Sequence, residues 1–215
     1  IGKLLKSLAI PAIIANLVNA LYNVVDQIFI GQGIGYLGNA ATNIAFPITT
    51  MCLAIGLTLG IGGASNFNLE LGKGYPEKSK HTAGTAASTL IIIGIILCIS
   101  VRIFLEPLMI SFGATDKILE YSIEYTGITS YGIPFLLFSI GVNPLVRADG
   151  NAKYSMLAIV IGAITNTILD PLFMFGFDMG MDGAAWATVI GQFISAIMLG
   201  LYFFRFKSVK FELKD

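Results

Sequence analysis

The sequence has little charge. Of its 215 residues, 12% are charged and 55% are hydrophobic, whereas a typical soluble domain carries about 25% charged residues. The mean hydropathy is +0.80. These values exclude an ordinary soluble globular protein and predict an integral membrane protein.

The sequence also lacks the residues that most metal and redox sites require. Its two cysteines, Cys52 and Cys98, lie inside apolar runs, and its single histidine, His81, has no Cys or His neighbour. A disulfide framework, a CxxC pair or a zinc site is therefore not expected. Thirteen Lys and Arg balance thirteen Asp and Glu, so no basic excess exists to bind a nucleic-acid backbone. We expect no nucleic-acid partner and no bound cofactor.

Long apolar runs divide the chain into candidate membrane spans. A helix that crosses about 30 Å of hydrocarbon needs about 20 largely apolar residues. The runs that meet this requirement cover residues 7–31, 42–69, 82–105, 118–143, 154–176 and 183–204. Connections rich in Gly, Asn, Asp and Lys separate them. The predicted fold class is all-α, a polytopic membrane protein with six transmembrane helices.

Positive residues lie mainly on one side of the predicted spans. If the amino terminus is cytoplasmic, the cytoplasmic segments hold Lys3, Lys6, Lys73, Lys78, Lys80, Arg147, Lys153, Arg205, Lys207, Lys210 and Lys214. Only Arg102 and Lys117 fall on the outer side. Because cytoplasmic loops retain positive residues, the sequence predicts a multi-pass protein of the cytoplasmic (inner) membrane with both termini in the cytoplasm.

Small residues and prolines occur inside the spans. Gly56, Gly60 and Ala64 form a small-xxx-small pattern, which lets neighbouring helices approach closely. We interpret it as a packing feature. Pro11, Pro47 and Pro134 each remove a backbone hydrogen bond from a helix and favour a kink.

Two acidic residues lie inside the predicted spans. Asp26 is the only charged residue of the first span, and Asp170 is the only one of the fifth. An ionisable residue at the centre of a membrane helix costs about 2.5–3.5 kcal/mol on insertion. One interpretation is that the two satisfy other polar groups, such as those freed by Pro171. Because Asn or Ser would serve packing at lower cost, we favour a functional site.

Helix geometry places other polar side chains near these acids. At a rise of about 1.5 Å per residue, Asp26, Asp170 and Thr188 lie at a similar depth, about 7–9 Å from the outer ends of their spans. Asn166 precedes Asp170 by four residues and shares its helix face. It lies deeper and would form the floor of the site.

Two ligands suit this group of four side chains. A pair of carboxylates in an apolar setting can carry protons, while carboxylate, amide and hydroxyl oxygens suit a hard cation such as sodium. Either ligand would convert a local charge into a neutral or paired state, which an ion-coupled transporter needs. Asn19 and Tyr22 extend a polar stripe along the helix of Asp26, and we expect them to line a polar cavity.

Several motifs resemble one transporter family. They are VDQIFIG at 25–31, LGNAA at 37–41, AFP at 45–47, LGKG at 71–74, RADGN at 147–151, NTILDP at 166–171 and GAAWATVIGQ at 183–192. Their content and order resemble the first six helices of multidrug and toxic compound extrusion (MATE) transporters of the prokaryotic, DinF-like branch. The similarity covers nearly the whole chain.

The resemblance implies an architecture larger than this chain. Members of the family have twelve helices, in two six-helix lobes related by an axis along the membrane normal. Residues 1–215 would form the amino-terminal lobe, without the carboxy-terminal lobe. The chain starts at Ile1 without methionine and stops in a basic segment, so we expect a fragment or a truncated gene product. A half-size protein acting as a homodimer is the alternative.

The resemblance also implies an activity and a set of site residues. The activity is antiport of sodium or protons against organic, often cationic, drugs and toxic compounds, without enzymatic chemistry. The family pattern places the cation or proton site on Asp26, Asn166, Asp170, Ala184 and Thr188. The kink of the first helix in the family matches Pro11. Bending of the helix at this hinge would link occupancy of the ion site to the shape of the cavity. A polar cavity residue of helix four matches Asn143, but our depth estimate puts Asn143 near the inner end of its span, outside the site.

Three alternatives exist for a membrane protein with buried aspartates. One is a non-transporting subunit of a membrane assembly, whose stability should not depend on a ligand. A lipid-linked oligosaccharide flippase of the same superfamily would have a basic cavity for pyrophosphate, yet the predicted spans contain almost no Lys or Arg. An intramembrane aspartyl protease would use the acids as a dyad, but they stand in VDQ and LDP rather than in YD and GxGD contexts. We therefore favour a transporter, with organic small molecules and membrane lipid as partners.

Overall fold

The computed structural model of the chain describes residues 2–206 and residue 208, with the backbone alone for residues 3–8. Within these residues all regular structure is helical. The α-helices are α1 (Gly2–Gly33), α2 (Tyr36–Gly72), α3 (Pro76–Ile103), α4 (Leu105–Ser111), α5 (Asp116–Thr129), α6 (Ile133–Ala148), α7 (Ala152–Pro171) and α8 (Gly180–Tyr202). Three short segments extend or join them: η1 (Ser130–Gly132), the π-helical η2 (Leu172–Gly176) and η3 (Phe203–Arg205).

Six helical segments within the described residues are long and apolar enough to cross a membrane, which confirms the predicted fold class. They cover Ala9–Gly33, Tyr36–Gly72, Pro76–Ile103, Asp116–Ala148, Ala152–Gly176 and Gly180–Arg205. Most continue beyond the predicted bounds, because a helix ends at turn residues rather than where its apolar run ends. The short helix α4, between the third and fourth segments, was not predicted.

The prolines inside the spans have different effects on the helices. The helix α1 continues through Pro11, and α2 continues through Pro47. The fourth segment, in contrast, is divided by η1 into α5 and α6 directly before Pro134. Proline is well tolerated in the first turn of a helix, where its missing N–H has no partner to lose. The kink expected at Pro134 is thus the start of a new helix, α6. At Pro11, in contrast, α1 continues without a break.

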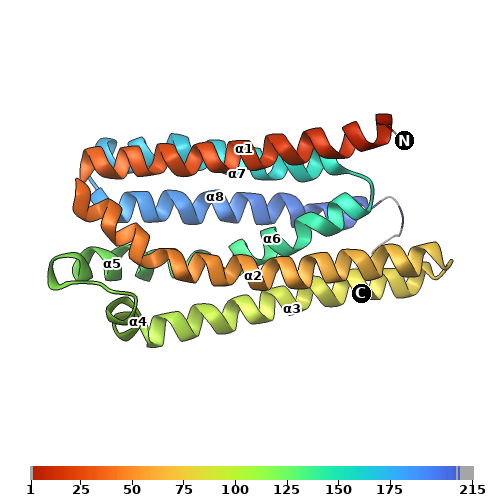
Figure 1. Cartoon of the computed structure of the whole chain (residues 1–215), viewed down its shortest axis with the longest axis horizontal. Helices are drawn as coiled ribbons and strands as arrows, with labels where there is room; N and C mark the ends of the chain where they lie inside the picture. Colours follow the sequence, from red (N-terminus) through yellow and green to blue (C-terminus); the bar gives the residue numbers. More distant parts are fainter. Residues whose placement is uncertain (1, 207, 209–215) are drawn as a thin grey trace.

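The long helices run up and down the bundle, and their connections lie at its two ends (Figure 1). The α2–α3 and α6–α7 turns lie at the end of the bundle where α1 begins and α8 ends, which we call the termini end. Gly74 and Gly150 have positive φ angles of 82° and 84° in these turns, a conformation that costs glycine little. Asn151 then caps α7 by accepting a hydrogen bond from the backbone N–H of Tyr154 (3.3 Å).

The described cations follow the predicted asymmetry along the bundle. Lys73, Lys78 and Lys153 lie in or beside the turns of the termini end, whereas Asp116 and Asp178 lie at the opposite end. The side chains of Lys3 and Lys6, and all of Lys207, Lys210 and Lys214, are outside the described residues.

The helices form two groups. The first contains α1, α7 and α8, with α7 packed against both of the others. The second contains α2, α3, α5 and α6, with α6 packed between α2 and α3 and also against α8. Large apolar side chains of the second group, such as Leu90, Leu137 and Leu145, are fully buried in its core. Outward-facing isoleucines of α3, including Ile92, Ile96 and Ile99, are more than half exposed.

Small residues bring α2 and α6 together. Gly56, Gly60 and Ala64 are buried on one face of α2. A side chain at Gly60 would collide with the backbone of Gly141, and one at Gly56 would collide with Ile140. The predicted packing role of this small-xxx-small pattern agrees with these contacts.

Candidate ion and substrate site

Two buried carboxyl groups face each other between α1 and α7. Asp26 on α1 is 6% exposed, and Asp170 in the last turn of α7 is fully buried. The two side chains lie close enough to interact with each other, since α1 packs along α7. The structure therefore brings the two acids of the sequence analysis into one site.

Asn166 and Thr188 complete this site from α7 and α8. The Asn166 Nδ2 donates to Asp170 Oδ1 over 3.2 Å and lies 3.4 Å from Thr188 Oγ1. Three helices thus supply oxygen-bearing side chains to one cluster, as the depth estimate predicted. We call Asp26, Asn166, Asp170 and Thr188 the acid-pair site.

Three oxygens of the acid-pair site have no hydrogen-bond donor among the described residues. They are Asp26 Oδ1, Asn166 Oδ1 and Asp170 Oδ2, and each is buried. Buried polar atoms are nearly always hydrogen-bonded, because an unpaired one is costly. Three acceptors without donors in one place are the arrangement that a proton or a sodium ion would satisfy.

The end of α7 has an unusual local structure. Pro171 follows Asp170 and cannot donate a backbone hydrogen bond, and the next residues, Leu172–Gly176, wind as a π-helix. Such segments are rare and are frequent at functional sites. Met174 of this segment is buried and packs with Ile30 of α1. The irregular turn thereby secures the two helices that carry the acids.

Two further residues lie beside the acid-pair site. Ala184, one turn before Thr188 on α8, is fully buried in an apolar cluster with Ile30 and Met174. Its methyl group offers no ligand, so it can take part only through its backbone. Tyr125 of α5 was not predicted, yet its hydroxyl lies close to Thr188 and within electrostatic range of Asp26. Nothing in its spacing could have distinguished it from the neighbouring tyrosines of the same helix.

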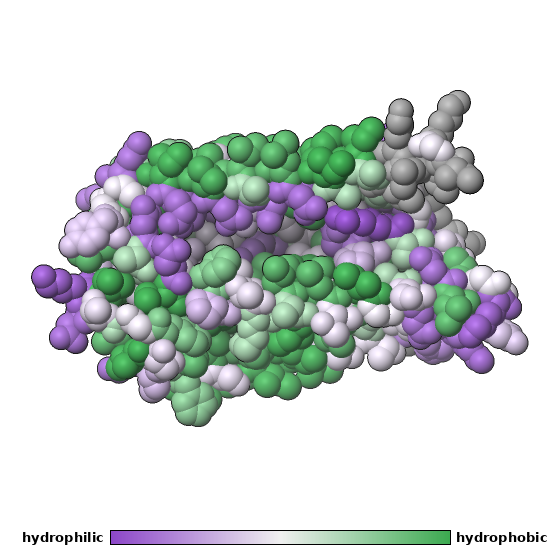
Figure 2. Space-filling view, in the orientation of Figure 1, coloured by the Kyte–Doolittle hydropathy of each residue, from purple (hydrophilic) through white to green (hydrophobic). Residues whose placement is uncertain are grey.

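A large cavity opens next to the acid-pair site. It has a volume of about 950 Å³ and is lined by α1, α2, α6, α7 and α8. Figure 2 shows the hollow between α1 and α2, with hydrophilic residues along one rim. Asn19 and Tyr22 line it, as do Asn166 and Thr188, whereas Asp26 and Asp170 are not among its lining residues. The acids therefore lie behind a wall that Asn166 and Thr188 help to form.

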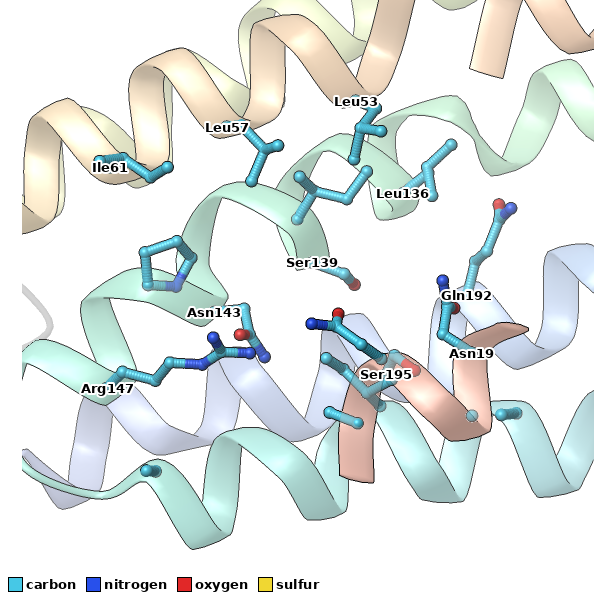
Figure 3. Close-up of a pocket in the computed structure, with 18 of the residues that line it drawn as sticks. Asn19, Leu53, Leu57, Ile61, Leu136, Ser139, Asn143, Arg147, Gln192 and Ser195 are labelled. Carbon is cyan, nitrogen blue, oxygen red and sulfur yellow. The ribbon is translucent and has the colours of Figure 1, made fainter. Parts of the chain in front are cut away.

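The cavity combines an apolar wall with a few polar groups (Figure 3). Leu53, Leu57 and Ile61 of α2 form the apolar side. Ser139 Oγ and Gln192 Oε1 are buried at the lining and have no hydrogen-bond partner among the described residues. Binding sites for drug-sized molecules have about 300–1,000 Å³ and this mixture of surfaces. The cavity is suited to an organic compound that makes few hydrogen bonds.

Two residues that the sequence analysis left outside the site belong to the cavity wall. It ended the fourth span at residue 143, but α6 continues to Ala148, so both Asn143 and Arg147 line the cavity. Asn143 is buried and its Nδ2 donates to the backbone oxygen of Ser155 (3.1 Å). Arg147, assigned to a cytoplasmic connection from the sequence, reaches the same turn of α7. Exclusion of Asn143 on the depth estimate was therefore wrong for the cavity.

A comparison with protein families identifies the fold that holds this site. A model of the family described as MatE matches residues 11–172. The chain belongs to the MatE family. The matched residues include Asp26, Asn166 and Asp170, and end before Thr188.

Individual relatives of the MatE family agree with this assignment. The multidrug export protein MepA of Staphylococcus haemolyticus is 26% identical over 209 residues, which are 95% of this chain and 45% of MepA. The solved structure of the MATE multidrug transporter DinF-BH is 37% identical, with a TM-score of 0.92, and the match covers 99% of this chain and 48% of that one.

A second structure shows the same partial match. It is the outward-facing conformation of a multidrug resistance MATE family transporter of the MOP superfamily, 30% identical, with a TM-score of 0.89. The match covers 99% of this chain and 48% of the transporter. The chain thus spans about half the length of the relatives that it matches.

Proposed function

We propose that the chain is the amino-terminal lobe of an exporter that couples the entry of sodium ions or protons to the extrusion of organic compounds. One observation carries the proposal. The acid-pair site has three buried oxygens without donors, and Asn166 and Thr188 separate it from a cavity of about 950 Å³. Relatives named as multidrug export proteins and multidrug transporters support it.

The geometry supports competition between ion and substrate. Asn166 contacts Asp170 with its amide and borders the cavity, so a change at the acids is transmitted to the cavity wall through one side chain. A proton or sodium ion at Asp26 and Asp170 neutralises the site. An empty site keeps its negative charge, which attracts a cationic compound to the cavity. Exclusive occupancy by ion or substrate is the condition for antiport.

We further propose that the coupling ion uses Asp26, Asp170, Asn166 and Thr188, with Ala184 contributing its backbone carbonyl. Pro11 lies on α1 between the termini end and Asn19. Because proline weakens the helix at this point, bending there would reshape the cavity while Asp26 changes its occupancy. The continuous α1 of this structure is then the straight state of that hinge.

The lobe needs a second half to enclose its cavity. The hollow opens between α1 and α2 (Figure 2), and the relatives are about twice as long as this chain. We propose that a carboxy-terminal lobe, or a second copy of this chain, covers it. The cations at the termini end favour placing that end in the cytoplasm, in the cytoplasmic membrane.

The structure does not favour a flippase or a protease. A flippase for pyrophosphate-linked lipids needs several cations, but Arg147 alone carries a charge among the described residues that line the cavity. A protease dyad must reach a peptide bond, but Asp170 is fully buried and neither acid lines the cavity.

The test is transport by the assembled protein in vesicles. We expect export of a cationic dye driven by an imposed sodium gradient or pH gradient, and loss of that dependence in Asp170→Asn. Asp178→Asn is the matched control, because Asp178 is exposed and has a positive φ of 56°, which asparagine tolerates. Equal transport by both variants, still driven by the gradient, would contradict the proposal.

A further inference from the structure

A guanidinium group projects into the cavity near the termini end. Arg147 lies in the last turn of α6, is half-buried and lines the cavity. Its Nε donates to Ser155 Oγ over 3.0 Å, which holds the side chain against α7. Figure 3 shows it extending from α6 beside Asn143. This hydrogen bond engages Nε, and the two terminal nitrogens of the fork donate none within the described residues.

No acid compensates this charge within the described part of the chain. The lining residues include neither Asp nor Glu, and the described ion pairs join Lys73 with Glu70 and Lys80 with Glu77. A charge in a membrane-spanning segment is costly unless it is paired or faces a polar cavity. Arginine is also the residue whose planar fork matches a carboxylate with two parallel hydrogen bonds. The Arg147 guanidinium thus lines the cavity with no acidic partner among the described residues.

The cavity is electrically polarised along its length. Ser155, which holds Arg147, and Asn166, which holds Asp170, are both on α7. Eleven residues of helix separate them, so the two ends are about 16 Å apart at a rise of about 1.5 Å per residue. The cation is at one end, and the acid pair is behind the wall at the other. The apolar side chains of α2 lie between the two ends.

We propose that Arg147 binds the carboxylate of zwitterionic organic substrates, whose cationic part lies toward the acid-pair site. The inference rests on the proposed function and names a substrate class within it. Apolar contact with Leu53 and Leu57 would hold the body of the compound. A substrate with a positive and a negative group at opposite ends therefore fits the cavity better than one with a positive group alone.

A matched pair of ligands tests this assignment. One is a rhodamine dye with a free carboxylate, and the other is the methyl ester of the same dye. Fluorescence polarisation measures the Kd of both for the assembled protein in lipid nanodiscs. In Arg147→Gln we expect the carboxylate dye to bind about ten- to a hundredfold more weakly, the range for losing a hydrogen bond to a charged group. The Kd of the ester for Arg147→Gln should stay within about twofold of its Kd for the unsubstituted protein, because the ester has no carboxylate to bind Arg147.

Two control variants separate recognition from general effects. Lys153→Gln removes an exposed cation from the same end of α7 and should leave both affinities unchanged. Arg147→Lys keeps the charge without the fork and should restore part of the carboxylate affinity. If Arg147→Gln does not fold, Arg147→Lys serves as the test variant. It should then show a smaller loss of affinity, still confined to the carboxylate dye.

The outcomes distinguish this inference from the proposed function. Equal weakening of both dyes, or no change in either, would overturn the role of Arg147 while leaving the cavity as a site for organic cations. Equal weakening would instead indicate that Arg147 pairs with an acid of the second lobe and supports the assembly. Failure of the unsubstituted protein to bind either dye would overturn the proposed function and, with it, the inference.

Discussion

Two buried aspartates near the ends of the bundle differ in how completely they are hydrogen-bonded. Asp149, in the α6–α7 turn, is 5% exposed. It accepts a hydrogen bond from the Tyr202 hydroxyl (2.7 Å) and another from the backbone N–H of Ser208 (2.9 Å). Asp170 is fully buried and accepts one from Asn166 through Oδ1, while its Oδ2 has no donor among the described residues.

The difference separates an acid with satisfied oxygens from the acid that we propose as functional. Both oxygens of Asp149 are satisfied, and they tie the end of α8 and the following segment to the α6–α7 turn. At Asp170 a second carboxylate, that of Asp26, lies close by, and like charges at short distance are unfavourable unless a proton or cation joins them. Burial alone does not distinguish the two acids, but the unpaired oxygen of Asp170 does.

The largest expected effect concerns stabilisation by the coupling ion. A ligand present at 100 times its Kd stabilises the folded state by about 2.7 kcal/mol. Thermal unfolding in detergent, with sodium varied at fixed pH and pH varied without sodium, should reveal this gain in the unsubstituted protein. We expect Asp170→Asn to abolish it, because the amide removes one of the two negative charges. Full retention of the gain by Asp170→Asn would place the ion elsewhere.

Asp149→Ala should have the opposite signature. It leaves the Tyr202 hydroxyl and the Ser208 N–H without their acceptor, and an unsatisfied buried group costs about 1–3 kcal/mol. The melting temperature should fall in the absence of any ion, while the ion-dependent gain remains. Asp149→Asn keeps one acceptor oxygen, so its melting temperature should lie between those of Asp149→Ala and the unsubstituted protein. Loss of the ion-dependent gain in Asp149→Ala would show that this acid is not merely structural.

Much of the fold and of the acid-pair site follows from simple properties of the chain. Uninterrupted apolar runs identify membrane helices because hydrocarbon tolerates few charges. The spacing of Asn166 and Asp170 fixes a shared helix face, and a constant rise per residue places Asp26 and Thr188 at the same depth. These features depend on one helix at a time, so the sequence contains them directly.

The unpredicted features depend on neighbours in space. Arg147 lies at the edge of its apolar run, and only the packing of α6 against α7 decides that its side chain enters the cavity. Tyr125 lies beside the acid-pair site because α5 packs against α8, the helix that carries Thr188. The donors that satisfy Asp149 come from the far end of the chain, through Tyr202 and Ser208. Such contacts join separate helices and have no signal in the periodicity of any one of them.

Tyr202→Phe would sharpen the comparison at Asp149. It removes one donor from Asp149 and leaves the aromatic packing with Tyr154 and Phe206 in place. The expected loss is about 1 kcal/mol, the usual net value of one hydrogen bond, measured as the free energy of unfolding. Tyr154→Phe is a control of the same size, since its hydroxyl donates to the backbone oxygen of Met198 (2.7 Å) rather than to a carboxylate. A loss that is clearly larger at Tyr202 would show that the charge of Asp149 strengthens its bond.

The smallest effect is expected at Thr188. Its hydroxyl lies 3.4 Å from the Asn166 amide, a long contact for a hydrogen bond. Its contribution should therefore lie at the low end of the net free energy of one hydrogen bond. Thr188→Val keeps the shape and removes the oxygen, and a loss of about 0.5 kcal/mol corresponds to an ion affinity about twofold weaker. Thr188→Ser retains the oxygen and should bind the ion as the unsubstituted protein does. A loss of tenfold or more in Thr188→Val, measured by the same ion titration, would mean that the hydroxyl coordinates the ion directly. In that case sodium, which needs several oxygen ligands, becomes a stronger candidate for the coupling ion than the proton, which needs only the carboxylates.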